Sequence, residues 1–200
     1  TIMKADYNCL SVIELTNQSI SPYTYSSIVC TSVYPPAFSD TYVKATSEFN
    51  PTIFPANFAT NTAKSLTGVW DSRQWLSANG QPSNQRFHID LGSAKIISKI
   101  YYENAHYSGL YVNAGVRDFT IWGSNSAADF ADLTYANDGT WTQITGISRT
   151  SFEIHKPVNA VDPKYISIGN TTAYRYYAVK IANNYGNNGY MGIRRIELQE

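Results

Sequence analysis

The chain has 200 residues, 15 basic and 15 acidic side chains, and a formal net charge of zero. This length suits one large domain, or one domain with an arm. The scattered basic residues form no stripe of the kind that binds nucleic acid, and no apolar run approaches the ~18 residues of a transmembrane segment. Charged residues make up only 15%, whereas tyrosine occurs 16 times, a composition typical of β-structure and of secreted or surface-displayed proteins.

The first 40 residues hold the apolar stretches "CLSVIEL" and "SSIVCTSVY" and end near Pro35 and Pro36. This pattern predicts two or three strands followed by a boundary. We therefore interpret residues 1–41 as an N-terminal extension or extra strands, and residues 42–200 as the main domain. Cys9 and Cys30 lie in the extension. One disulfide between them would close a loop of about 20 residues and contribute roughly 3 kcal/mol; two free buried thiols are the alternative.

The next segments alternate between loops and patterned strands. "SLTGVWDSRQWLSANGQPSNQ" is predicted as a long loop. "RFHIDLG" places Phe87, Ile89 and Leu91 on one face and His88 and Asp90 on the other, as in a half-buried strand. The two strands "KIISKIYYEN" and "VRDFTIWGSN" flank a loop rich in Tyr, Asn, Gly and His.

The second half continues as short strands. "SAADFADLTYANDG" has room for a short helical turn, and five segments after it are predicted as strands: "TWTQITGI", "SFEIH", "KYISIGN", "YRYYAVKIANN" and "MGIRRIELQ". No amphipathic helix of normal length is present. Many short strands separated by turn signals indicate an all-β fold, an antiparallel sandwich or barrel.

The last strand breaks its own alternation. Met191 and Ile193 share one phase, while Ile196 and Leu198 share the other. A β-bulge near Arg194 and Arg195 would place all four apolar side chains on the core face.

The order of these segments resembles the discoidin, or coagulation-factor type C, family and its bacterial relatives, the family 32 carbohydrate-binding modules. The matching pieces run from "WLS" and "RFHIDLG" through "DFTIWGS" and Trp141 to "YRYYAVKI" and "GYMGIRRIEL", so the resemblance covers roughly residues 42–200. It implies an eight-stranded antiparallel jelly-roll β-sandwich that binds ligands through loops at one end.

Sugar recognition needs flat aromatic surfaces, together with amides, carboxylates or guanidinium groups that hydrogen-bond hydroxyls. Three loops carry this chemistry, and in the sugar-binding relatives the second and third lie together. The predicted ligand-binding residues are Trp70 and Arg73 in the first loop; Asn104, His106, Tyr107, Tyr111 and Asn113 in the second; and Tyr185, Asn187, Asn188 and Tyr190 in the third. Trp75 corresponds to a tryptophan that usually packs under the loops.

The resemblance also implies a possible structural calcium ion, with one departure from the family pattern. The C-terminal Glu that family members use corresponds here to Arg195, which would repel calcium and could fill its place as an internal cation. Asp71 and Glu197 are the residues that could restore a calcium site.

These observations predict a non-catalytic carbohydrate-binding or adhesion module of a larger secreted, cell-surface or virion-tail protein. No G-x-S-x-G, metal-ligand cluster or phosphate-binding glycine loop suggests an enzyme. The alternative is a structural module that contacts neighbouring domains or copies of itself in a fibre, filament or particle. Lipid-headgroup binding is disfavoured because the loops are polar and nearly uncharged.

Overall fold

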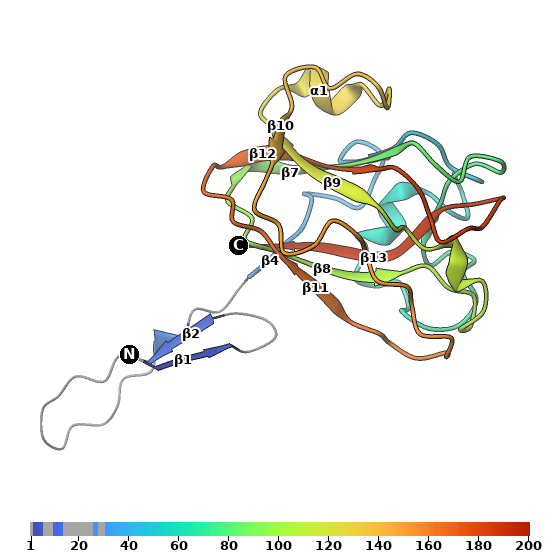
Figure 1. The fold of residues 1–200 in the computed structure, drawn as a ribbon. Helices are drawn as coiled ribbons and strands as arrows, with labels where there is room; N and C mark the ends of the chain where they lie inside the picture. The colour runs from blue at the N-terminus through green and yellow to red at the C-terminus, as the bar shows by residue number, and fades with distance from the viewer. Residues whose placement is uncertain (1, 6–9, 14–25, 28–30) are drawn as a thin grey trace, which may run out of the picture.

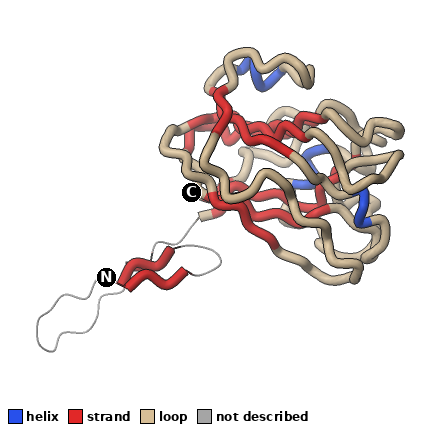
Figure 2. Tube along the Cα trace, viewed as in Figure 1, coloured by secondary structure: helices blue, strands red, loops and turns tan. Residues whose placement is uncertain are grey.

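In a computed structural model the chain forms a β-sandwich of two antiparallel sheets, with a small separate sheet at the N-terminus (Figures 1 and 2). The structure describes residues 2–5, 10–13, 26–27 and 31–200. None of the helices in this part of the chain is long and apolar enough to cross a membrane.

The upper sheet in Figure 1 has the strand order β10-β9-β12-β7-β5. Its strands are β5 (Val43–Ala45), β7 (Gln85–Lys95), β9 (Phe119–Ser124), β10 (Thr142–Ile144) and β12 (Tyr174–Ile181). The lower sheet has the order β11-β8-β13-β4, with β6 also pairing to β13. Its strands are β4 (Ser32–Val33), β6 (Trp75–Leu76), β8 (Lys99–Asn104), β11 (Lys164–Ser167) and β13 (Gly192–Gln199). The all-β sandwich predicted from the sequence is confirmed.

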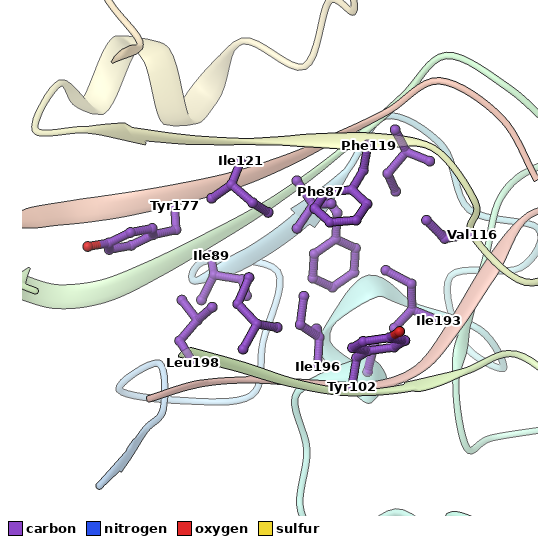
Figure 3. Packing of buried hydrophobic residues seen from close by; sticks show 14 of the residues in the cluster. Phe87, Ile89, Tyr102, Val116, Phe119, Ile121, Tyr177, Ile193, Ile196 and Leu198 are labelled. Carbon is purple, nitrogen blue, oxygen red and sulfur yellow. The ribbon is translucent and has the colours of Figure 1, made fainter. Parts of the chain in front are cut away.

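The core lies between the two sheets and follows from strand alternation. Phe87 and Ile89 of β7 point from the upper sheet toward Tyr102 and Ile196 of the lower sheet (Figure 3). Trp75 is fully buried, and its indole N–H donates to the Ser47 carbonyl at 2.9 Å. The expectation that this tryptophan packs beneath the loops is confirmed.

A second apolar cluster covers the outer face of the upper sheet. The short helix α1 (Ala127–Ala131) lies above this sheet (Figure 1) and brings Phe130 over β12 and β7. Phe130 stacks on Tyr176, and His88 lies between Phe130 and Trp141. His88 and Asp90, predicted as a polar strand face, therefore have different surroundings. Both are buried: His88 packs among aromatic rings, and Asp90 forms an ion pair with Arg175 at 2.8 Å.

The bulge predicted in the last strand is present. The register of β13 against β8 shifts between Ile193, opposite Asn104, and Arg195, opposite Glu103. Met191, Ile193, Ile196 and Leu198 all belong to the core cluster. The extra residue is Arg194, which the bulge turns toward the loops at the end of the sandwich.

The N-terminal sheet consists of β1 (Ile2–Ala5), β2 (Leu10–Ile13) and β3 (Ser26–Ser27). Among the described residues, none of these strands pairs with either sheet of the sandwich. β4, in contrast, belongs to the segment predicted as an extension and pairs with β13 through Val33 and Leu198. Cys9 and Cys30 lie outside the described residues, so their predicted disulfide stays a prediction.

Candidate functional site

The three predicted loops meet at one end of the sandwich, which we call the rim: residues 66–75, 105–115 and 183–190. In Figure 1 this end, marked by the yellow-green helix η2 (Val112–Ala114), lies opposite the C-terminus. The Ser108 N–H donates to the Gly68 carbonyl at 2.9 Å and joins the first two loops. The Tyr185 N–H donates to the Asn113 carbonyl at 3.1 Å and joins the second and third.

An aromatic cluster built from all three loops forms the centre of the rim. The Trp70 ring lies 5.3 Å from Tyr107, 5.5 Å from Tyr111 and 6.2 Å from Tyr190, measured between ring centroids. Tyr111 is 57% exposed, whereas Trp70, Tyr107 and Tyr190 are half-buried. The structure therefore brings together four of the aromatic residues that the sequence predicted, and it leaves part of their surface open to solvent.

The rim backbone is held in strained conformations. Tyr111 has φ 51° and ψ 30°, in the left-handed region that a bulky side chain rarely adopts. Ser72 and Ser108 also have positive φ, so the rim holds three of the four such non-glycine residues in the described chain. Strain of this kind costs on the order of 1 kcal/mol per residue and gathers at functional sites.

The second and third rim loops also carry asparagine side chains. Asn187 Oδ1 accepts the N–H groups of Gly189 and Tyr190, each at 2.9 Å, so it shapes the third loop. Its Nδ2 donates to Asn113 Oδ1 at 3.4 Å, and Asn188 is exposed with no hydrogen bond to any described residue. The Tyr185 hydroxyl donates to the Phe152 carbonyl and is therefore already engaged. Asn188 therefore keeps a free amide on the third loop, two residues before Tyr190 in the sequence.

Two predicted ligand contacts lie inside the protein. Asn104 is fully buried, and its Nδ2 donates to the carbonyls of Val116 at 2.8 Å and Glu153 at 3.0 Å. His106 is also fully buried. Both side chains hold the base of the second loop, and neither reaches the surface in this structure.

The hydrogen bonds of His106 define its neutral form. Nδ1 accepts the Gly109 N–H at 3.0 Å, which leaves Nε2 to donate to the Leu66 carbonyl at 3.0 Å. Its ring stacks on His155 with 3.9 Å between centroids. Burial, with Arg194 and His155 nearby, lowers the pKa of His106 to about 4. Burial also lowers the pKa of His155, whose Nε2 lies 3.8 Å from Glu103.

Arg194 joins two of the rim loops from below. Its guanidinium donates to the carbonyls of Gly68 at 3.0 Å, Val69 at 3.1 Å and His106. The side chain is fully buried, and burial followed by repulsion from Arg73 lowers its pKa to about 10. Arg73 itself donates to the Thr67 carbonyl at 2.8 Å and is half-buried within the first loop.

The residues present do not fit a calcium ion. Asp71 is exposed at the tip of the first loop, while Glu197 accepts hydrogen bonds from Arg195 and Tyr34, each at 3.0 Å. In the described part of the chain, no three or more His, Cys, Asp or Glu side chains gather where they could hold a metal ion. Carbonyl oxygens of the rim, which are ligands that calcium prefers, face the Arg194 guanidinium instead.

Sequence reasoning missed two residues that matter for the rim. Phe49, 45% exposed, lies outside the three predicted loops, yet its ring is 5.0 Å from Tyr190. Arg194 was expected only as part of the bulge, and the role of internal cation was assigned to its neighbour Arg195. Arg195 is buried as well, where it pairs with Glu197 and donates to the Lys64 carbonyl at 2.7 Å. The phase change in "MGIRRIEL" was the signal that one of the two arginines leaves the strand face.

The fold is that of the discoidin and family 32 carbohydrate-binding modules, as comparison with solved structures shows. The family 32 module of C. perfringens NanJ, solved with galactose, has a TM-score of 0.53 and 17% identity; the match covers 79% of this chain and 92% of that one. A part of the Streptococcus pneumoniae β-galactosidase BgaA has a TM-score of 0.61 and 11% identity, with 84% and 97% covered. An F5/8 type C domain of Bacteroides fragilis has a TM-score of 0.57 and 13% identity, with 86% and 96% covered.

The chain belongs to the DUF5000 family, described as a domain of unknown function, whose model matches residues 64–199. The matched segment contains all three rim loops. A comparison with curated proteins gave no match.

Proposed function

We propose that this chain is a non-catalytic carbohydrate-binding module that holds glycans on its rim. The observation that carries the proposal is the packing of Tyr107, Tyr190 and the exposed Tyr111 around Trp70, on loops that also carry the free amide of Asn188. Aromatic faces cover the apolar side of a sugar ring, and amides hydrogen-bond its hydroxyl groups. Solved modules of the same fold are described in complex with galactose and with GalNAc-β-1,3-galactose, which supports the ligand class.

Binding by one rim is expected to be weak. Each net hydrogen bond contributes only about 1 kcal/mol, so a single site should have a Kd of about 10⁻⁴–10⁻³ M. Useful adhesion would then need several copies acting together. This fits a module that is one part of a larger secreted, cell-surface or virion-tail protein, in which other parts supply multivalency or catalysis.

Calcium is not needed in this proposal. The guanidinium of Arg194 places a fixed positive charge on carbonyls of the first two loops. A structural cation bound at the same carbonyls would hold the two loops together in the same way. The rim should therefore keep its shape in a chelator.

The test is a glycan-array screen with the protein clustered on a multivalent carrier, beside a Tyr111→Ala variant prepared in the same way. Binding of the wild type to a defined sugar, lost in a variant with an unchanged melting temperature, supports a glycan-binding rim. Absence of binding by the clustered wild type across a broad array contradicts the proposal.

One observation favours a second function, a structural interaction module. The β1-β2-β3 sheet pairs with no strand of the sandwich among the described residues, and so small a sheet is at best marginally stable alone. A neighbouring domain or a second copy would bury it. Sedimentation of the full chain tests this: a concentration-dependent oligomer lost on removal of residues 1–30 supports it, and a monomer at all concentrations counts against a second copy.

A further inference from the structure

The aromatic surface of the rim continues beyond the predicted loops. From the exposed Tyr111 it passes to Trp70 at 5.5 Å, then to Tyr190 at 6.2 Å and on to Phe49 at 5.0 Å, measured between ring centroids. Among the described residues, the Phe49 ring contacts only Tyr190 and the buried Phe54, so Phe49 is the last exposed ring of this surface. The four rings therefore form a path, which we call the aromatic strip, and its two ends are its most exposed members.

Phe49 is held in place at the far end of this strip. Its N–H donates to the Leu76 carbonyl at 2.9 Å, and its ring packs on the buried Phe54 at 5.6 Å. The Gly80 N–H donates to the Gly189 carbonyl at 2.8 Å, which fixes residues 77–80 beside Tyr190. A single exposed phenylalanine needs no explanation, but one that extends a fixed aromatic surface indicates a contact site.

Free amides accompany the strip in its middle. Asn79 and Asn188 are both exposed and make no hydrogen bond to any described residue. A Cβ built on Gly189, the residue before Tyr190, would lie 3.4 Å from Asn79 Oδ1, so the Asn79 amide lies against the backbone of the third loop. Hydroxyl groups of a ligand lying over Tyr190 would find donors and acceptors within reach.

We propose that the strip binds a glycan chain of at least two or three sugar units, with Phe49 as the residue that contacts the distal unit. This inference rests on the proposed function and adds to it the length of the ligand. Each step between neighbouring rings, 5.0 to 6.2 Å, is comparable to the length of one pyranose unit, and the ring at each end of the strip is open to solvent. A single terminal sugar would use only Tyr111 and Trp70 and would leave Phe49 without a role.

The experiment measures affinity against chain length by titration calorimetry. The probes are β-1,4-linked oligomers of galactose, glucose and N-acetylglucosamine, each from one to four units, with the full chain as the protein. For a series that binds, we expect a gain of about tenfold or more between one and three units. Phe49→Ala should remove that gain while leaving the affinity for the single sugar unchanged, whereas Tyr111→Ala should weaken both.

Two further variants keep the result interpretable. Phe49→Leu retains apolar bulk without an aromatic face and should behave as Phe49→Ala if stacking is the contact. Phe38→Ala removes a phenylalanine whose ring contact is Tyr34, away from the strip, and should bind as the wild type does. Equal affinity for one and three units, or an unchanged trisaccharide affinity in Phe49→Ala, overturns the inference and leaves the glycan-binding rim intact. No binding in any series, together with an empty array, overturns both.

Discussion

His106 and His155 stack face to face beneath the rim, with ring centroids 3.9 Å apart and planes 20° apart, and both are fully buried. Two stacked imidazoles are compatible only while at least one is neutral, because like charges at this distance repel strongly. The Arg194 guanidinium on the His106 carbonyl adds a fixed positive charge next to the pair. Two acidic groups lie near the pair: the Asp162 charge acts on both histidines, and Glu103 Oε2 lies 3.8 Å from His155 Nε2.

The buried histidines predict a loss of stability in acid. The pKa of His106 is lowered to about 4 and that of His155 is also lowered, whereas unfolded histidines titrate near about 6.5. Between these values the unfolded chain binds more protons, so stability is full above about pH 6.5 and falls as the pH drops toward 4. The effect is about 1.4 kcal/mol for each unit by which a pKa is lowered. Urea unfolding at pH 7.5, 6 and 5 measures it.

A variant separates the rim pair from the third histidine. His88, whose pKa burial also lowers to about 4, lies under α1 and contributes in the same direction. His106→Gln keeps a donor for the Leu66 carbonyl but has no titrating group, so its stability should depend less steeply on pH than that of the wild type. An identical pH dependence in the two proteins would remove His106 from the explanation.

Because the Arg194 guanidinium holds the rim loops, we expect the rim to be stable without calcium but to be destabilised when Arg194 is replaced. Arg194→Met would leave the carbonyls of Gly68, Val69 and His106 without their donor and should destabilise the fold by about 3 kcal/mol. Excess EDTA should leave the melting temperature of the wild type unchanged. Arg117→Met is the matched control, since Arg117 is 52% exposed and should cost less than about 0.5 kcal/mol. A melting temperature that falls in EDTA would show that a metal ion takes part.

Two substitutions of Tyr111 distinguish its effect on stability, through backbone strain, from its effect on glycan binding. Because its φ of 51° suits glycine better than any residue with a Cβ, Tyr111→Gly should be more stable than Tyr111→Ala by about 1 kcal/mol. Both variants should lose glycan binding by about tenfold or more, since both remove the exposed ring. Thermal unfolding and array binding of the two proteins, measured side by side, check this. Binding retained by either variant would place the ligand away from Tyr111.

Asn104 and Asn188 predict opposite outcomes for the same substitution. Asn104→Ala removes two donated hydrogen bonds from a fully buried amide and should destabilise the protein by about 2 kcal/mol. Asn188→Ala removes an exposed amide without internal partners and should change stability by less than about 0.5 kcal/mol while weakening glycan binding. Melting temperatures and glycan affinities of the two variants, measured together, show whether each asparagine stabilises the fold or contacts the ligand. A stable Asn104→Ala protein with weakened binding would reverse the assignment of Asn104.

The strands were predictable because burial between two sheets imposes a period of two on the sequence. Phe87, Ile89 and Leu91 alternate with His88 and Asp90, and all three apolar side chains are buried in the core. The β-bulge in β13 was also predictable from the sequence, because the change of phase between Ile193 and Ile196 requires one extra residue in that strand. The discoidin fold was expected from the resemblance of the segment order to that family, and not from the alternation itself.

The rim was predictable as a region but not residue by residue. Loop residues follow no period, so their burial depends on which other loops cover them. Asn104 and His106 carry the chemistry of a ligand contact, yet the segments around Val116 and Leu66 enclose them. Phe49 carries no such signal in its own segment, and only the approach of Tyr190 makes it part of an aromatic surface.

The sequence by itself determined the alternating strands, the bulge and the loops that carry aromatic and amide groups, because each is a local consequence of alternation and composition. The tertiary structure decided which of those groups face solvent and which partners each of the two buried arginines contacts. Arg194 and Arg195 are neighbours in the same strand, and their chemistry is identical. The bulge directs Arg194 to the carbonyls of Gly68 and Val69 and leaves Arg195 beside Glu197, a difference that exists only once the strands are paired.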